Sequence, residues 1–197
     1  MDQEVAMRLY APLTLSPLAA GARIAQPSTP GRVTLDDPAF SVMTDLREVS
    51  AATTMPEESI DSAHAIMIRR AVRLLFVLDR QGAVAGIITA TDLLGEKPMR
   101  FIEARGVSHS EVQVGDIMTP APRLEALSLL DVAQMRVGHI VATLKAVNRR
   151  HLTVAEDGGH RIRGLFSASQ VARQLGMELQ TFEIAQTFAD IEAALAR

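Results

Sequence analysis

The amino-acid sequence predicts an α/β (α+β) protein built from two tandem copies of one supersecondary unit. Three kinds of segment occur twice in the 197-residue chain and in the same order: a Met-Thr segment, an apolar run, and a glycine-led strand with a hydroxyl-rich turn. The pairs are 42–44 and 117–119, 74–79 and 151–156, and 86–94 and 164–172, at offsets of 75, 77 and 78 residues. Because the offset is nearly constant, we expect two units of similar fold.

The composition indicates a folded globular protein. Hydrophobic residues make up 48% and charged residues 22% of the chain, which is not the balance of a disordered protein. The net charge of −3 gives no general attraction to nucleic acid or to an anionic membrane. The chain has no cysteine, which excludes disulfides, thiolate catalysis and cysteine-bound metals. Without a long apolar run or a basic start typical of a signal peptide, a cytoplasmic location is expected.

Residues 1–39 are predicted to form an extended N-terminal arm. Proline removes a backbone donor and disfavours helix, and five prolines lie in this stretch. They are Pro12, Pro17, Pro27, Pro30 and Pro38. The leucines between them are too apolar for a free tail, so part of the arm is expected to lie on the core.

The first unit is predicted over residues 40–95. Ile60, Ala63, Ile66 and Met67 recur at helical spacing and predict a helix over 59–70. Two strands joined by a turn at 79–82 should follow, and then a helix that starts near Thr91. A connector over 96–112 is expected to carry a short helix that begins near Pro98 and ends at Gly106.

The second unit is predicted over residues 113–176. Capping-box spacing at 128–131 suggests an extra short helix, and the main helix is expected over 137–147. Ile140, Val141 and Leu144 should point inward from that helix. Strands are expected near 152–155 and 161–166, on either side of the Gly158-Gly159 turn.

A last helix is predicted over residues 177–197. It would place five apolar side chains along one stripe. These are Phe182, Ala185, Phe188, Ile191 and Leu195. The stripe either packs on its own domain or forms a subunit interface, and the sequence leaves both open.

The repeated unit resembles the CBS domain, the cystathionine-β-synthase-type module, in the tandem pair known as a Bateman module. The resemblance covers about residues 40–176. It is carried by Val42-Met43-Thr44, by Ile117-Met118-Thr119-Pro120 and by the Gly86–Leu93 turn. It implies two β-α-β-β-α units packed with pseudo-two-fold symmetry. It also implies clefts between the units that hold adenosyl ligands such as AMP, ADP, ATP or S-adenosylmethionine.

The turn of the first unit matches the ligand-binding turn of the family. There the aspartate accepts hydrogen bonds from both ribose hydroxyls, and Asp92 stands at its position. Thr89 and Thr91 match the hydroxyls that contact ribose or phosphate. The alternative is structural: both threonines cap a helix and Asp92 complements its dipole.

The turn of the second unit departs from the family pattern. Ser167 and Ser169 keep the two hydroxyls, but Gln170 stands where the aspartate is expected. A neutral amide can still bond a ribose hydroxyl, but it loses the charge assistance of a carboxylate. We therefore expect the first turn, with Asp92, to be the stronger binding site.

Basic residues precede the buried strand of each unit. Arg73 and Arg150 occupy equivalent positions, where related modules put residues that contact phosphate, and His151 lies beside the second. Either arginine could instead be an ordinary solvated surface residue. The apolar residues around Val42-Met43-Thr44 and 75–77 would form the adenine slot, although most would be core in any case.

The sequence therefore predicts a regulatory or sensor module and no enzyme. It contains no paired nucleophile and base, no phosphate-binding loop, and no metal-ligand spacing among its histidines. A homodimer that binds an adenine nucleotide is expected, and it would act through a regulated protein partner or through its own oligomeric state. The alternative is a non-catalytic interaction module whose clefts are empty.

Overall fold

The computed structural model of this chain describes residues 16, 17, 19, 21 and 32–176, and the fold below is that of 32–176. The predicted helix over 177–197 and most of the predicted arm lie outside the described residues. No helix in the described part of the chain is long and apolar enough to cross a membrane.

Two four-stranded mixed sheets organise residues 32–176. One has the order β2-β3-β4-β5, formed by Thr53–Thr54, Leu74–Leu78, Val84–Thr89 and Thr119–Pro120. The other has the order β1-β8-β7-β6, formed by Thr44–Asp45, Arg161–Ser167, His151–Glu156 and Ala126–Ser128. In each sheet a central antiparallel hairpin has one parallel and one antiparallel neighbour.

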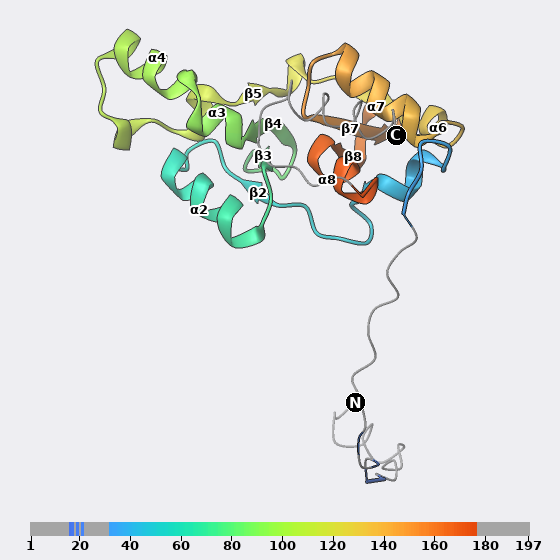
Figure 1. The fold of residues 1–197 in the computed structure, drawn as a ribbon. Helices are drawn as coiled ribbons and strands as arrows, with labels where there is room; N and C mark the ends of the chain where they lie inside the picture. Colours follow the sequence, from blue (N-terminus) through green and yellow to red (C-terminus); the bar gives the residue numbers. More distant parts are fainter. Residues whose placement is uncertain (1–15, 18, 20, 22–31, 177–197) are drawn as a thin grey trace, which may run out of the picture. The chain divides into compact units, whose positions relative to one another are not determined.

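Helices flank the two sheets. Figure 1 shows α2 and α4 on one side and α6 and α7 on the other, with the strands between them. The α-helices are α2 Ile60–Arg70, α3 Ala90–Leu94, α4 Glu96–Arg105, α5 Val114–Ile117, α6 Leu129–Val132, α7 Val137–Ala146 and α8 Ala168–Gln174. Short 3-10 turns are η1 Ala39–Val42, η2 His109–Glu111, η3 Ala121–Arg123 and η4 Asp157–Gly159.

The predicted helices are confirmed within the described part of the chain. α2 begins after Ser59, whose hydroxyl accepts a hydrogen bond from the Ser62 amide at 3.1 Å. The connector helix, α4, begins two residues before Pro98 and ends at Gly106 in the left-handed conformation. α6 forms at the predicted place, but the Ser128 side chain makes no capping hydrogen bond.

The two hairpins have the same register, which confirms the repeat. Leu74 pairs with Thr89 in the first hairpin, and His151 pairs with Ser167 in the second. Each hairpin also shifts register at the same point, after Val77 and after Val154, which are 77 residues apart. The repeated sequence therefore folds into two hairpins with the same strand pairing and the same register shift.

The short strand that leads into each unit pairs with the sheet of the other unit. β1 joins β8 of the second unit, and β5 joins β4 of the first. The same exchange recurs at the helix starts, where Ser59 bridges Gln113 and Pro38 bridges Arg136. Neither sheet is therefore built from one unit alone.

Two glycines allow the exchanged segments to approach the hairpins. A Cβ on Gly86 would lie 2.4 Å from the Thr119 carbonyl oxygen, and one on Gly164 would lie 2.6 Å from the Met43 sulfur. Real Cβ atoms do not come this close to other atoms. The glycine that leads each repeated turn is thus explained by this contact.

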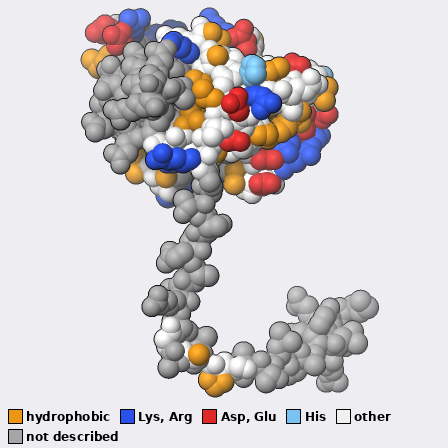
Figure 2. All heavy atoms as spheres, turned by 45° about the vertical axis from the view of Figure 1, so that its right-hand side comes forward, with side chains coloured by type: hydrophobic (Ala, Val, Ile, Leu, Met, Phe, Trp, Pro, Cys, Tyr) orange, Lys and Arg blue, Asp and Glu red, His pale blue; other side chains and the backbone are white. Residues whose placement is uncertain are grey.

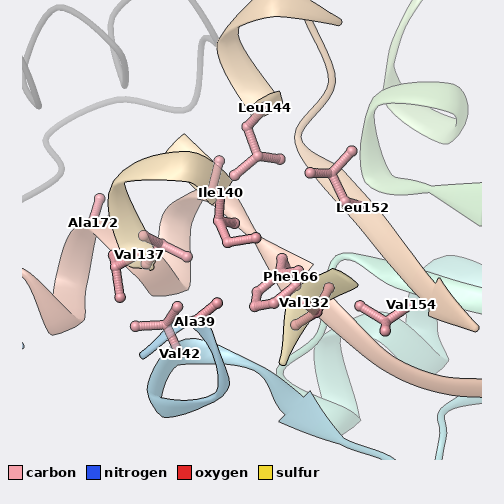
Figure 3. Packing of buried hydrophobic residues seen from close by; sticks show 12 residues of the cluster. Ala39, Val42, Val132, Val137, Ile140, Leu144, Leu152, Val154, Phe166 and Ala172 are labelled. Atoms are coloured by element: carbon pink, nitrogen blue, oxygen red, sulfur yellow. The ribbon is translucent and has the colours of Figure 1, made fainter. Parts of the chain in front are cut away.

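Each unit has its own hydrophobic core, completed by the exchanged segment. Figure 3 shows Phe166 among Ile140, Val132 and Val154 in the second core, with Ala39 and Val42 entering from the segment before β1. The first core contains Ala52, Ile60, Ala63, Met67, Leu75, Val77, Ile88, Leu93, Val112, Val114 and Ile117. The last three come from the segment that precedes β5.

Candidate ligand-binding clefts between the two units

The first candidate turn links β4 to α3 and is held by its own side chains. One Asp92 oxygen, Oδ2, accepts hydrogen bonds from the Thr89 amide at 2.8 Å and from the Thr89 hydroxyl at 2.7 Å. The other, Oδ1, lies 2.6 Å from the Lys97 ammonium, which also donates to the Ile117 carbonyl at 3.1 Å. Asp92 is 8% exposed. Both of its oxygens are thus engaged within the protein.

The second turn links β8 to α8 and is held more loosely. The Ser167 side chain makes no capping hydrogen bond. Gln170 is half-buried, and its side-chain oxygen accepts a hydrogen bond from the Thr44 hydroxyl at 3.1 Å. This bond joins the second turn to the exchanged strand β1.

A large cavity, here called cleft 1, lies at the second turn. Its volume is about 860 Å³, within the range of small-molecule sites. It is lined from the second sheet and α8 by Thr44, Leu165, Ser167, Ser169, Gln170 and Arg173. Residues of the first unit complete it: Leu46, Val49 to Ala52, Arg70 to Leu74, and Phe76. His151 also lines it. Cleft 1 is therefore a site between the units.

A smaller cavity, cleft 2, lies at the first turn. Its volume is about 480 Å³. It is lined by Ile87, Thr89, Thr91, Asp92, Thr119, Arg123, Leu124, Glu125, Asn148 to His151, and Thr153. Thr44 lines cleft 1, and the equivalent Thr119 lines cleft 2. The two clefts are therefore related by pseudo-symmetry.

The arginine before each central strand faces the turn of the other unit. Arg73 lines cleft 1, as Gln170 does, whereas Arg150 lines cleft 2, as Asp92 does. The backbone carbonyls of Arg73 and Arg150 each accept an amide hydrogen bond at 2.9 Å, from Ala90 and Ala168 respectively. Each arginine is thereby fixed to its own turn by its backbone and lines the cleft that contains the other turn.

His151 lines both clefts and is held neutral. Burial, together with the positive charges of Arg150 and Arg73, lowers the pKa of its imidazole to about 4, against a smaller opposing effect of Asp92. Burial and the charge of Arg150 also lower the pKa of Arg73, although a guanidinium stays charged at neutral pH. The region around His151 therefore carries the positive charges of both Arg73 and Arg150.

The structure separates the predicted site residues into two groups. Thr89, Thr91, Asp92 and Arg150 line cleft 2. Thr44, Ser167, Ser169 and Arg73 line cleft 1. His151 belongs to both.

Of the residues predicted for the adenine slot, Thr44 and Phe76 line cleft 1. Leu75 and Val77 are fully buried in the first core, whereas their neighbours Leu74 and Phe76 line cleft 1. Val42 lies in the second core, and Met43 packs against that core beside Gly164. Neither Val42 nor Met43 is among the residues that line the two clefts.

Several residues of these clefts were not found by sequence reasoning. Arg173 lies three residues after Gln170 on α8, so helical spacing could have placed it near the turn. Glu125, which lines cleft 2, and Lys97, which pairs with Asp92 but lines neither cleft, gave no such signal, because each comes from a segment apart from its partner. Their contacts appear only in the folded chain.

Comparison with known proteins finds a family model that matches part of the chain. Residues 39–98 match the model of the CBS domain. Over these residues the chain is similar to the CBS-domain family. A search of curated proteins found no match.

Solved structures share the fold of the CBS pair. An uncharacterized conserved protein from Pyrococcus horikoshii is similar with a TM-score of 0.55 and 21% identity, over 76% of this chain and 100% of that one. CBSX2 of Arabidopsis thaliana, in complex with AMP, has a TM-score of 0.50 and 21% identity, over 70% and 94%. The CBS domain pair of protein MJ0100, with 5′-methylthioadenosine and S-adenosyl-L-methionine, has 0.50 and 20%, over 73% and 97%.

Proposed function

We propose that this CBS pair is a regulatory, non-catalytic module that binds an adenosyl ligand between its two units. The observation that carries the proposal is cleft 1, where an apolar wall, hydroxyls and arginines from both units surround one cavity. An apolar wall suits a purine base, while hydroxyls and guanidinium groups suit ribose and phosphate. Two CBS pairs of similar fold hold AMP or S-adenosyl-L-methionine in their solved structures, which supports the choice of ligand class.

A ligand in such a cleft would act on the relation between the two units. Cleft 1 takes its walls from both sheets, so an occupant makes contacts that depend on how the units are packed. A ligand stabilises the arrangement that it binds best, in proportion to its difference in affinity. The predicted output through a protein partner, the predicted homodimer and the predicted cytoplasmic location stay predictions.

A thermal-shift panel tests the proposed function. The ligands are adenosine, AMP, ADP, ATP, S-adenosylmethionine and NAD, each with the full-length chain. A ligand at 100 times its dissociation constant adds about 2.7 kcal/mol to the free energy of unfolding, a readily measured shift. At least one adenosyl compound should raise the melting temperature. If none does at millimolar concentration, the chain is better described as an interaction module with empty clefts.

A further inference from the structure

The described residues that line cleft 1 include three arginines and no carboxylate. Arg70 comes from the end of α2, Arg73 from the start of β3, and Arg173 from α8, so the three reach the cavity from both units. None of the described residues that line it is an aspartate or a glutamate. Arginine stays charged at every physiological pH, so this excess is permanent.

The remaining polar groups of cleft 1 are neutral. Gln170 stands where the first unit has Asp92, and its side-chain oxygen bonds a hydroxyl, that of Thr44. Arg70 donates to the Ser50 carbonyl at 3.2 Å, and both residues line the cavity. A cationic group on a ligand would meet no carboxylate among the described lining residues, whereas phosphate groups would meet guanidinium groups.

Cleft 2 differs because carboxylates line it, each of them in an ion pair. It also has three arginines, but Asp92 and Glu125 line it with them. Glu125 lies 2.7 Å from the Arg149 guanidinium, and Lys97 lies 2.6 Å from Asp92. With about 480 Å³ against about 860 Å³, cleft 2 is also the smaller. A ligand there would have to displace internal ion pairs before making its own.

The face of the protein in Figure 2 shows acidic and basic side chains interspersed, with no broad area of one sign. The chain as a whole carries a net charge of −3. Attraction of a polyanion therefore cannot come from the molecule at large and must be local to the cavity.

We infer that cleft 1 is the working ligand site and that it selects a nucleoside di- or triphosphate over a monophosphate and over the sulfonium S-adenosylmethionine. The inference rests on the proposed function and adds to it the charge of the ligand and the choice of cleft. It reverses the sequence-based ranking of the two turns, because the Asp92 carboxylate is occupied by Thr89 and Lys97.

Isothermal titration calorimetry with the full chain in magnesium-free buffer tests the ligand charge. The affinity should rise from adenosine to AMP, ADP and ATP, and should fall with added salt most steeply for ATP. Arg173→Gln should weaken ATP about tenfold, the loss of one charge-assisted hydrogen bond, and leave adenosine unchanged. Arg123→Gln is the matched control, since Arg123 is an exposed arginine that lines only cleft 2. It should leave ATP binding unchanged.

A second pair of variants tests the choice of cleft. Leu165 and Ile87 are equivalent, half-buried strand residues that line cleft 1 and cleft 2 respectively. Leu165→Trp should fill cleft 1 and abolish ATP binding, whereas Ile87→Trp should not. Circular dichroism checks that both variants fold, and the phenylalanine variant at the same position, Leu165→Phe or Ile87→Phe, replaces a tryptophan variant that does not.

The outcomes separate this inference from the proposed function. If S-adenosylmethionine binds as tightly as ATP, or if only Ile87→Trp abolishes binding, the inference is overturned while the proposed function stands. If inorganic tripolyphosphate binds and no adenosyl compound does, the anion site stands while the proposed function fails.

Discussion

Leu74, Phe76 and Gln170 line cleft 1 at the positions where cleft 2 has His151, Thr153 and Asp92. The backbone around both clefts is nevertheless the same, with equal hairpin registers and equal strand exchange. Hydrogen bonds of the main chain hold this frame and do not depend on those three side chains. The comparison shows how a duplicated frame can keep its geometry while each cleft acquires its own chemistry.

The largest expected difference between the units concerns their two close-packed glycines. In Gly86→Ala the new Cβ meets a backbone oxygen, that of Thr119, which cannot move aside, whereas in Gly164→Ala it meets the flexible Met43 side chain. We expect a loss of about 3 kcal/mol in the free energy of unfolding for the first and about 1 kcal/mol for the second. Urea denaturation measures both. Equal losses would show that strand β5 shifts to accommodate the new Cβ as readily as the Met43 side chain does.

The next effect concerns His151 and its equivalent, Leu74. The folded pKa of His151, about 4, lies below the unfolded value of about 6.5, so the unfolded chain binds the extra proton between these pH values. Stability should therefore fall as the pH is lowered from 7 to 5, by about 2 kcal/mol from this group. The groups that act on it are Arg150, Arg73 and Asp92, of which only Asp92 favours the proton.

His151→Leu makes cleft 2 resemble cleft 1 at this position and removes that pH dependence. Denaturation at pH 7 and pH 5 should show a smaller loss for the variant than for the parent. His160→Asn, at an exposed position, serves as the control and should behave as the parent. A variant that loses as much stability as the parent would assign the acid sensitivity to other groups.

The smallest effect concerns the residues that end the two main helices. Ala71 and Asn148 are equivalent, exposed, and in the left-handed conformation, with φ of 52° and 50°. Asparagine tolerates this conformation better than alanine does. Ala71→Asn should therefore stabilise the protein, and Asn148→Ala destabilise it, each by about 0.5–1 kcal/mol. Thermal unfolding of the two variants, and of the double variant that exchanges them, measures the pair; shifts of the same sign would contradict the expectation.

The helices and hairpins could be predicted from the sequence because they carry a periodic or repeated pattern. Strands of two residues, such as β1 and β5, are too short for any period, so their exchange between sheets was not foreseen. The run Leu74–Leu78 is apolar at every position, and such a run does not say which side chains face the core. For that reason the predicted slot took in all of 75–77, of which only Phe76 lines cleft 1.

The candidate site was predictable to a similar degree. Hydroxyls and arginines were found because each occurs in both repeats, as with Arg73 and Arg150. Lys97, the ion-pair partner of Asp92, was not found in this way, because it belongs to α4, a helix outside the repeated pattern. Which arginine faces which turn depends on packing between the sheets, which a local pattern does not record.

The exchange of β1 and β5 also bears on how such a chain could arise and how it could be divided. A fragment cut within the connector would keep β1 but lose β8, with which β1 pairs, and the other fragment would carry away β5. Each fragment would hold the strand that the other lacks, so the two should reassemble by fragment complementation. By the same logic, a single-repeat ancestor could complete its sheet only by exchanging leading strands with a second copy. The present chain is in effect a strand-swapped dimer whose two subunits have become one polypeptide.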